Sequence, residues 1–197
     1  KHIEQYELDK PFDFSGFKED IPDGYGDTTV KLVTDNQDAF RRKSFHELGC
    51  GTGQLLNALN PSYGVGVDLS TNMVSIAQKN YPNLEFIQGD LEDQEFISSL
   101  KGPFDYIILS DTIGYLDDCE EAFSGLHSLC TSDTRLIIAY YSWRWRPILT
   151  LGEKIGLKMP SVEMNWLSTE DTIGLLQLAD FDTVKTEWRQ LVPRNLL

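Results

Sequence analysis

A glycine-rich turn stands between a short apolar segment and a helical pattern early in the chain. It reads Glu47-Leu48-Gly49-Cys50-Gly51-Thr52-Gly53, and leucines at 55, 56 and 59 follow with helical spacing. Glycine lets a backbone turn sharply and approach a ligand closely, and the start of the next helix presents unpaired N–H groups to that ligand. The turn therefore predicts a nucleotide-like ligand, although glycines also serve purely structural turns.

An acidic residue ends the next apolar segment, Gly64-Val65-Gly66-Val67-Asp68, and lies 19 residues after Gly49. A carboxylate at this place suits the two hydroxyls of a ribose. The turn reads G-x-G-x-G, whereas dinucleotide sites use G-x-G-x-x-G, whose third glycine lets the helix approach a pyrophosphate. A nicotinamide-dependent oxidoreductase is therefore the weaker interpretation of this pair of signals.

Short apolar segments alternate with longer helical patterns from Ser44 onward, which predicts βα units in an α/β fold with a doubly wound, mostly parallel sheet. The expected strands are 45–48, 63–67, 84–88, 104–109 and 136–141. Helices are expected near 53–60, 71–80, 93–101 and 118–131. Asp117 or Asp118 is expected to cap the last of these. Ser168 and Asp171 form a capping-box pattern before a further helix, and a sixth strand is expected over 183–191.

These motifs resemble those of class I S-adenosylmethionine-dependent methyltransferases, which have a Rossmann-like fold. The resemblance rests on the glycine turn, on Val65–Ser70, and on two later strand motifs, 86–91 and 104–110. It implies S-adenosylmethionine as cofactor. It also implies which residues bind it: Glu47, Gly49, Gly51 and Gly53 around the methionine moiety, Asp68 and Leu69 at the ribose, Asp90 and Leu91 at the adenine, and Ser110 along the methyl-transfer cleft.

A narrower resemblance covers roughly 44–194. The segments 110–118, 134–142, 156–160 and 165–168 look like bacterial methyltransferase domains fused ahead of a family 2 glycosyltransferase. We expect two parts, an irregular arm over 1–43 and a cofactor-binding domain over 44–197. The usual final antiparallel strand is expected to be missing, since only three residues follow Arg194.

Few residues of the sequence indicate where the methyl acceptor would bind. Asp111 and Tyr115 follow the fourth strand, where a catalytic base would lie, but a turn or cap is the alternative role for the aspartate. Tyr141, Trp143 and Trp145 follow the fifth strand among arginines. They suit an acceptor pocket, with packing against the end of the sheet or contact with a membrane surface as alternatives.

The charge and the cysteine content disfavour several kinds of partner and site. The formal net charge of −14 disfavours nucleic acid as a partner and also the anionic surface of a membrane. Three cysteines without metal-site or disulfide spacing fit a reducing cytoplasm, and no metal site is expected. The leading hypothesis is methyl transfer to a small or carbohydrate-linked acceptor. The alternative is a non-catalytic, cofactor-binding regulatory or docking module of a larger glycosyltransferase fusion.

Overall fold

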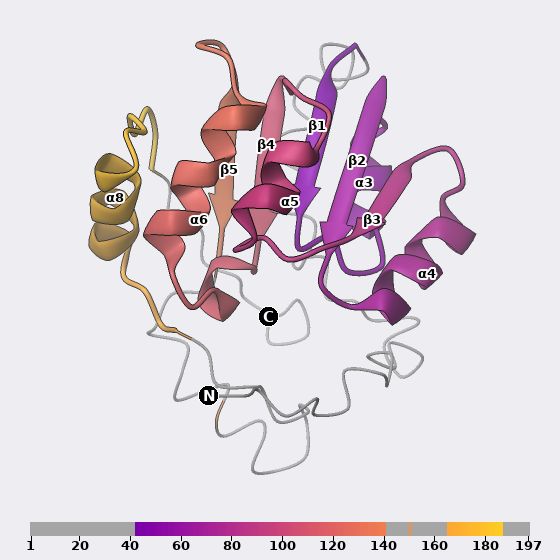
Figure 1. The fold of residues 1–197 in the computed structure, drawn as a ribbon, viewed down its shortest axis with the longest axis horizontal. Helices are drawn as coiled ribbons and strands as arrows, with labels where there is room; N and C mark the ends of the chain where they lie inside the picture. Colours follow the sequence, from indigo (N-terminus) through magenta and orange to yellow (C-terminus); the bar gives the residue numbers. More distant parts are fainter. Residues whose placement is uncertain (1–41, 141–149, 151–164, 187–197) are drawn as a thin grey trace, which may run out of the picture.

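A twisted sheet of five parallel strands forms the centre of the protein, in the order β3-β2-β1-β4-β5 (Figure 1). The computed structural model describes residues 42–140, 150 and 165–186. The chain order reverses between the neighbours β1 and β4, so the predicted doubly wound α/β fold is confirmed. The strands are β1 (Ser44–Leu48), β2 (Tyr63–Asp68), β3 (Glu85–Gln88), β4 (Tyr106–Ser110) and β5 (Arg135–Ala139).

Helices cover both faces of the sheet because successive side chains of each strand point to opposite sides. On one face, Phe45 of β1 and Ile108 of β4 pack against α3 (Gln54–Leu59) and α4 (Thr71–Asn80). On the other, the core contains Leu48 and residues of α5 (Gln94–Ser99) and α6 (Cys119–Gly125), and it extends to α8 (Thr169–Leu178). Figure 1 shows α5 and α6 in front of the sheet. All three cysteines are free thiols.

Side-chain caps begin most of the helices, as the sequence predicts. Asp118, not Asp117, caps α6 by accepting from the N–H of Glu121. Ser168 and Asp171 form the expected capping box of α8. The expected helix over 118–131 is shorter than predicted: α6 ends at Gly125, and a 3₁₀ turn, η3 (Leu126–Leu129), follows. Glycine favours such a break because it stabilises helix interiors poorly.

Several predicted strand boundaries move by one or two residues. β4 begins at Tyr106 instead of residue 104, because Phe104 donates to Leu129 and Asp105 is engaged with the start of β1. There Asp105 accepts from the Ser44 N–H and from Lys43 Nζ, at 2.8 and 2.7 Å. Residues 183–186 of the expected sixth strand form no strand. The rest of that strand, the expected arm up to residue 41 and the chain end lie outside the described residues.

His46 is the least satisfied polar side chain of the core. It is 0% exposed, and its ring stacks on Phe104 with 4.7 Å between ring centroids. Neither ring nitrogen forms a hydrogen bond of good geometry within the described residues, and the nearby Val65 backbone opposes only part of the effect of burial on the ring. Burial lowers the pKa of His46 to about 4, so the imidazole is neutral in the folded protein.

We expect His46→Leu to raise the free energy of unfolding at pH 7 by about 1–3 kcal/mol, since two unsatisfied buried nitrogens are removed. The stability of the wild type relative to this variant should also fall by up to about 3 kcal/mol as the pH drops from 6.5 to about 4, because only the unfolded wild-type chain binds a proton at His46 in that range. All other titrating groups are common to both proteins and cancel in this difference. Urea unfolding from pH 4 to pH 7 measures both effects.

His127 provides the matched control, because its Nε2 lies 2.7 Å from the Ala179 carbonyl oxygen and its ring stacks on Phe181. His127→Leu should therefore lower stability at pH 7. A His46→Leu protein less stable than wild type at pH 7 would contradict the account of His46.

Candidate functional site

The glycine turn follows β1 at the carboxyl edge of the sheet, next to the reversal of strand order. Gly49, Gly51 and Gly53 all have positive φ angles, of 78°, 51° and 78°. The N–H groups of Gly49 and Cys50 both donate to the Val67 carbonyl, at 2.8 and 2.9 Å. The turn is thus attached to β2 before the chain enters α3.

The three glycines serve different purposes. A Cβ on Gly49 would overlap the side chain of Thr112, and one on Gly53 would overlap the ring of Phe86. A Cβ on Gly51 would have no neighbour within 4 Å. Gly49 and Gly53 are therefore required for packing, whereas Gly51 borders open space where a ligand can approach the backbone.

Asp68 connects the turn to the end of β2. Its Oδ2 accepts from the Gly51 N–H at 2.7 Å, and its Oδ1 accepts from the Ser70 N–H at 2.9 Å. An ionised carboxylate has about four acceptor positions, so two remain for a ligand. Asp68 and Gly51, which the sequence analysis assigns to different parts of one cofactor site, are thus in direct contact.

Glu47 lies beneath the turn and does not border the open space. It is 3% exposed, and its Oε2 accepts from the Leu56 N–H of α3 at 3.1 Å. This bond satisfies a free N–H of a helix whose N-cap, Gly53, has no side chain to do so. Burial raises the pKa of Glu47 to about 8, and the nearby Asp68 charge acts in the same direction.

The neighbouring strand ends complete the edge. Gly89, after β3, donates its N–H to the Asp68 carbonyl at 3.1 Å, which brings Asp90 close to the end of β2. Asp90 is exposed and accepts from the Glu92 N–H, and Leu69 is 58% exposed. Leu91, by contrast, is 8% exposed and belongs to the core.

Thr112 has a role that the sequence analysis did not assign. Its Oγ1 donates within reach of two carbonyl oxygens, those of Leu48 at 2.9 Å and Ser110 at 3.1 Å. The same side chain fills the space that the missing Cβ of Gly49 leaves. The sequence shows only a threonine shortly after the fourth strand. That its hydroxyl reaches the Leu48 carbonyl of β1 is visible only in the folded structure.

Asp111 and Tyr115 lie on the segment that leaves β4. Asp111 has a φ of 55°, and its backbone N–H donates to the Ala139 carbonyl at 2.7 Å. Burial raises the pKa of Asp111 to about 7. Tyr115 lies in η2 (Ile113–Tyr115), is 54% exposed, and has a pKa raised by burial and by the charge of Asp111.

The aromatic residues predicted on the acceptor side cannot be placed. Tyr141, Trp143 and Trp145 lie outside the described residues. Within the described ranges, no cluster of His, Cys, Asp and Glu could hold a metal ion, and no helix has the length and apolar content to cross a bilayer.

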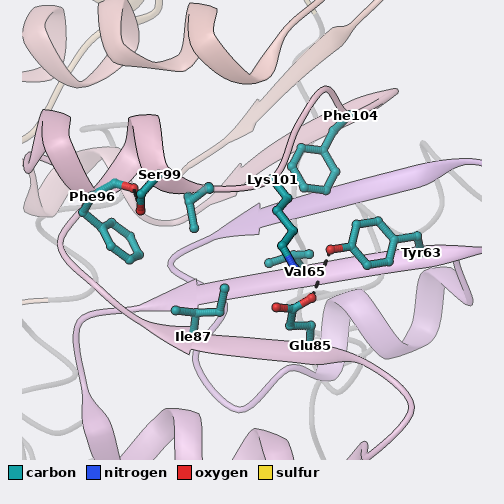
Figure 2. A pocket seen from close by; sticks show the side chains of 9 residues that line it. Tyr63, Val65, Glu85, Ile87, Phe96, Ser99, Lys101 and Phe104 are labelled. Carbon is teal, nitrogen blue, oxygen red and sulfur yellow. Dashed lines mark hydrogen bonds between the residues drawn. The ribbon is translucent and has the colours of Figure 1, made fainter.

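A hollow of about 170 Å³ lies at the other end of the sheet (Figure 2). Tyr63 and Glu85, the first residues of β2 and β3, border it and share a hydrogen bond of 3.0 Å. Because the strands are parallel, this hollow is separate from the glycine turn.

Comparison with known proteins gives the family. Residues 17–186 match the model of a methyltransferase domain family, starting within the segment 1–43 that the sequence analysis sets apart. A malonyl-[acyl-carrier protein] O-methyltransferase of Halalkalibacterium halodurans is 34% identical over 89 residues, 42% of this chain and 33% of that protein. A second curated relative, from Geobacillus sp. (strain WCH70), is 33% identical over 110 residues, 51% of this chain and 43% of its own length.

A solved structure with the same fold is a magnesium protoporphyrin IX methyltransferase from Synechocystis PCC 6803 with bound SAH. It has a TM-score of 0.64 and 21% identity, and the match covers 85% of this chain and 76% of that one. The family match shows a methyltransferase domain, and its fold is that of this solved methyltransferase. The chain belongs to this methyltransferase domain family, and it spans less than half the length of the two curated relatives described above.

We expect alanine to act differently at the three glycines. Each substitution places a side chain in a left-handed backbone, which costs about 1–2 kcal/mol. Gly49→Ala and Gly53→Ala should lose a further ~1–3 kcal/mol through overpacking against Thr112 and Phe86, and Gly51→Ala should not. Urea unfolding of the three variants measures how much stability each one loses. Equal losses at all three positions would contradict the distinction.

Proposed function

We propose that the chain transfers the methyl group of S-adenosylmethionine to a small or carbohydrate-linked acceptor. The observation that supports this best is the contact between Asp68 and the Gly51 N–H, at 2.7 Å, beside the open space at Gly51. Together they join a carboxylate with free acceptor positions to a backbone that a ligand can approach closely.

The residues at this edge fit the cofactor. Asp68 would accept hydrogen bonds from ribose hydroxyls, with Leu69 exposed beside it, and Gly51 would face the methionine moiety. Asp90 would accept from the adenine amino group, and Ser110 would border the methyl-transfer cleft. When bound, the cofactor supplies an electrophilic methyl group on a sulfonium. Glu47, Gly49 and Gly53 support the turn, and Leu91 supports the core beneath the adenine side.

Methyl transfer needs little else from the protein. A sulfonium is already an activated leaving group, so orienting the acceptor and excluding water supply much of the acceleration. The Halalkalibacterium relative is named as an O-methyltransferase of malonyl-[acyl-carrier protein], but the identity extends over only 42% of this chain. We therefore keep the broader acceptor class that the sequence suggests.

A fused or associated glycosyltransferase stays a prediction from the sequence motifs. The alternative function, a docking module without catalysis, is less well supported, because the contacts of Asp68 and the open space at Gly51 are intact. The two functions differ in one measurement: a catalytic domain converts bound S-adenosylmethionine to S-adenosylhomocysteine when acceptor is present.

We expect Asp68→Ala to weaken binding of S-adenosylhomocysteine by about 10- to 150-fold, since a charge-assisted hydrogen bond worth about 1.5–3 kcal/mol is lost. Titration calorimetry measures this directly. Asp133→Ala is the matched control, since Asp133 is exposed in the turn before β5, and it should leave the affinity unchanged. Unchanged affinity in Asp68→Ala would remove this residue from the site.

We expect Gly51→Val to abolish the same binding in a folded protein, because the branched side chain would occupy the open space. Gly174→Val on α8 is the control, since a Cβ there also meets no neighbour within 4 Å. Circular dichroism checks that both variants fold. Titration with NAD should give no binding, and tight NAD binding would favour the oxidoreductase interpretation.

A further inference from the structure

Asp111 is the first residue after β4, which ends at Ser110. In the register of β1 with β4, Leu48 pairs with Leu109, so the turn that begins at Gly49 lies level with the segment that begins at Ser110. Asp111 thus emerges at the carboxyl edge between the glycine turn and the end of β5. This is the edge at which open parallel sheets bind their ligands.

The backbone at Asp111 is held in an unfavourable conformation from several sides. Its φ of 55° lies in the left-handed region, which among residues other than glycine is adopted mainly by aspartate and asparagine. Its N–H donates to the Ala139 carbonyl, and the hydroxyl of the next residue, Thr112, donates to the Leu48 carbonyl. Further along the same segment, the Gly114 carbonyl accepts from the Asn165 N–H at 2.7 Å. Strained residues that the surroundings fix in this way are concentrated at functional sites.

Among the described residues, no group is recorded as a hydrogen-bond or ion-pair partner of the Asp111 carboxylate, and burial is the cause that raises its pKa. The side chain is only partly exposed. Other aspartates of the structure are used differently: Asp105 pairs with Lys43, and Asp118 caps α6. Left-handed aspartates often bond their own backbone, and Asp111 does not do so. The charge of Asp111 acts on Tyr115, whose pKa it helps burial to raise.

We propose that Asp111 is the proton acceptor for an organic amine that enters the site as an ammonium ion. This inference rests on the proposed methyl transfer and names the class of acceptor. The Asp111 carboxylate takes one proton from R–NH₃⁺, leaving R–NH₂ with its nitrogen lone pair. A new C–N bond to the methyl group forms as the C–S bond breaks, and the electron pair of that bond stays on sulfur. Asp111 then returns its proton to water.

The electrostatics favour an amine over a carboxylate acceptor. A carboxylate has no proton to give at neutral pH, and it would be repelled by Asp111 and by a chain of net charge −14. An ammonium ion is attracted by both. Burial holds the pKa of Asp111 near 7, close to the operating pH at which a general base works best.

The first test follows the Asp111 carboxyl by carbon NMR in the S-adenosylhomocysteine complex, with propylamine, propanol and propionate as matched probes. We expect an elevated pKa that falls when propylamine is added, because a cation favours the ionised carboxylate. Propanol and propionate should not lower it. A titration near the ordinary value of 3.8, or no response to the amine, would overturn the proposal.

The second test supplies radiolabelled S-adenosylmethionine and a deproteinised bacterial extract separated into cationic, neutral and anionic metabolites. The labelled methyl group should enter the cationic fraction. It should stay bound in mild base, because mild base hydrolyses methyl esters but does not cleave a bond between carbon and an amine nitrogen. Asp111→Asn should reduce the rate by at least about 100-fold. It should leave the affinities for S-adenosylmethionine and S-adenosylhomocysteine within about twofold of wild type. Asp180→Asn is the control, since Asp180 also has a positive φ, of 58°, but is exposed beyond α8.

The outcomes separate the two proposals. A wild-type protein that does not bind S-adenosylhomocysteine would refute the proposed function itself. A protein that binds it but places no label in the cationic fraction, or keeps its rate in Asp111→Asn, would refute only the role of Asp111. Weaker binding of S-adenosylmethionine alone in Asp111→Asn would also refute it, because Asp111 would then pair with the sulfonium.

Discussion

The attachment of the glycine turn to the end of β2 is the contact on which the rest of the site depends. Two N–H groups of the turn share the Val67 carbonyl, and a third, from Gly51, donates to Asp68. These bonds fix the position of the turn relative to the carboxyl end of β2. Thr112 completes the support from β4 through the Leu48 carbonyl. Within the described residues, the candidate site is therefore built on the ends of three adjacent strands, β2, β1 and β4.

Buried polar groups near the turn fall into two kinds. Glu47 and Thr112 have partners, and each partner is a backbone group that would otherwise be unsatisfied. His46 has no hydrogen-bond partner for its ring nitrogens within the described residues. It is enclosed by the core and stacks on Phe104, so it has no access to a ligand. The side chain of Asp111, which is only partly buried, instead lies at the edge of the sheet where we propose that the ligands bind.

The two ends of the sheet are chemically different. At the amino end, Lys43, Ser44 and Asp105 form a polar cluster that joins β1 to the start of β4. A shallow hollow lies beside it, bordered by Tyr63 and Glu85 (Figure 2). At the carboxyl end, glycines with positive φ come together with the carboxylates of Asp68 and Asp90. The family match, which covers 17–186, includes both ends, and the carboxyl end is the one to which we assign the proposed cofactor site.

The sequence by itself determined the fold class, the glycine turn, the acid that ends β2 and the caps of α6 and α8. These features depend on local spacing and on contacts between residues close in the chain, so periodicity reveals them. Only the tertiary structure decided that Glu47 faces α3 and not the open space, that Gly51 alone of the three glycines borders that space, and that Thr112 supports Gly49. Each of these depends on which strands become neighbours. The order β3-β2-β1-β4-β5 brings together residues up to 64 positions apart, and no local pattern records that order.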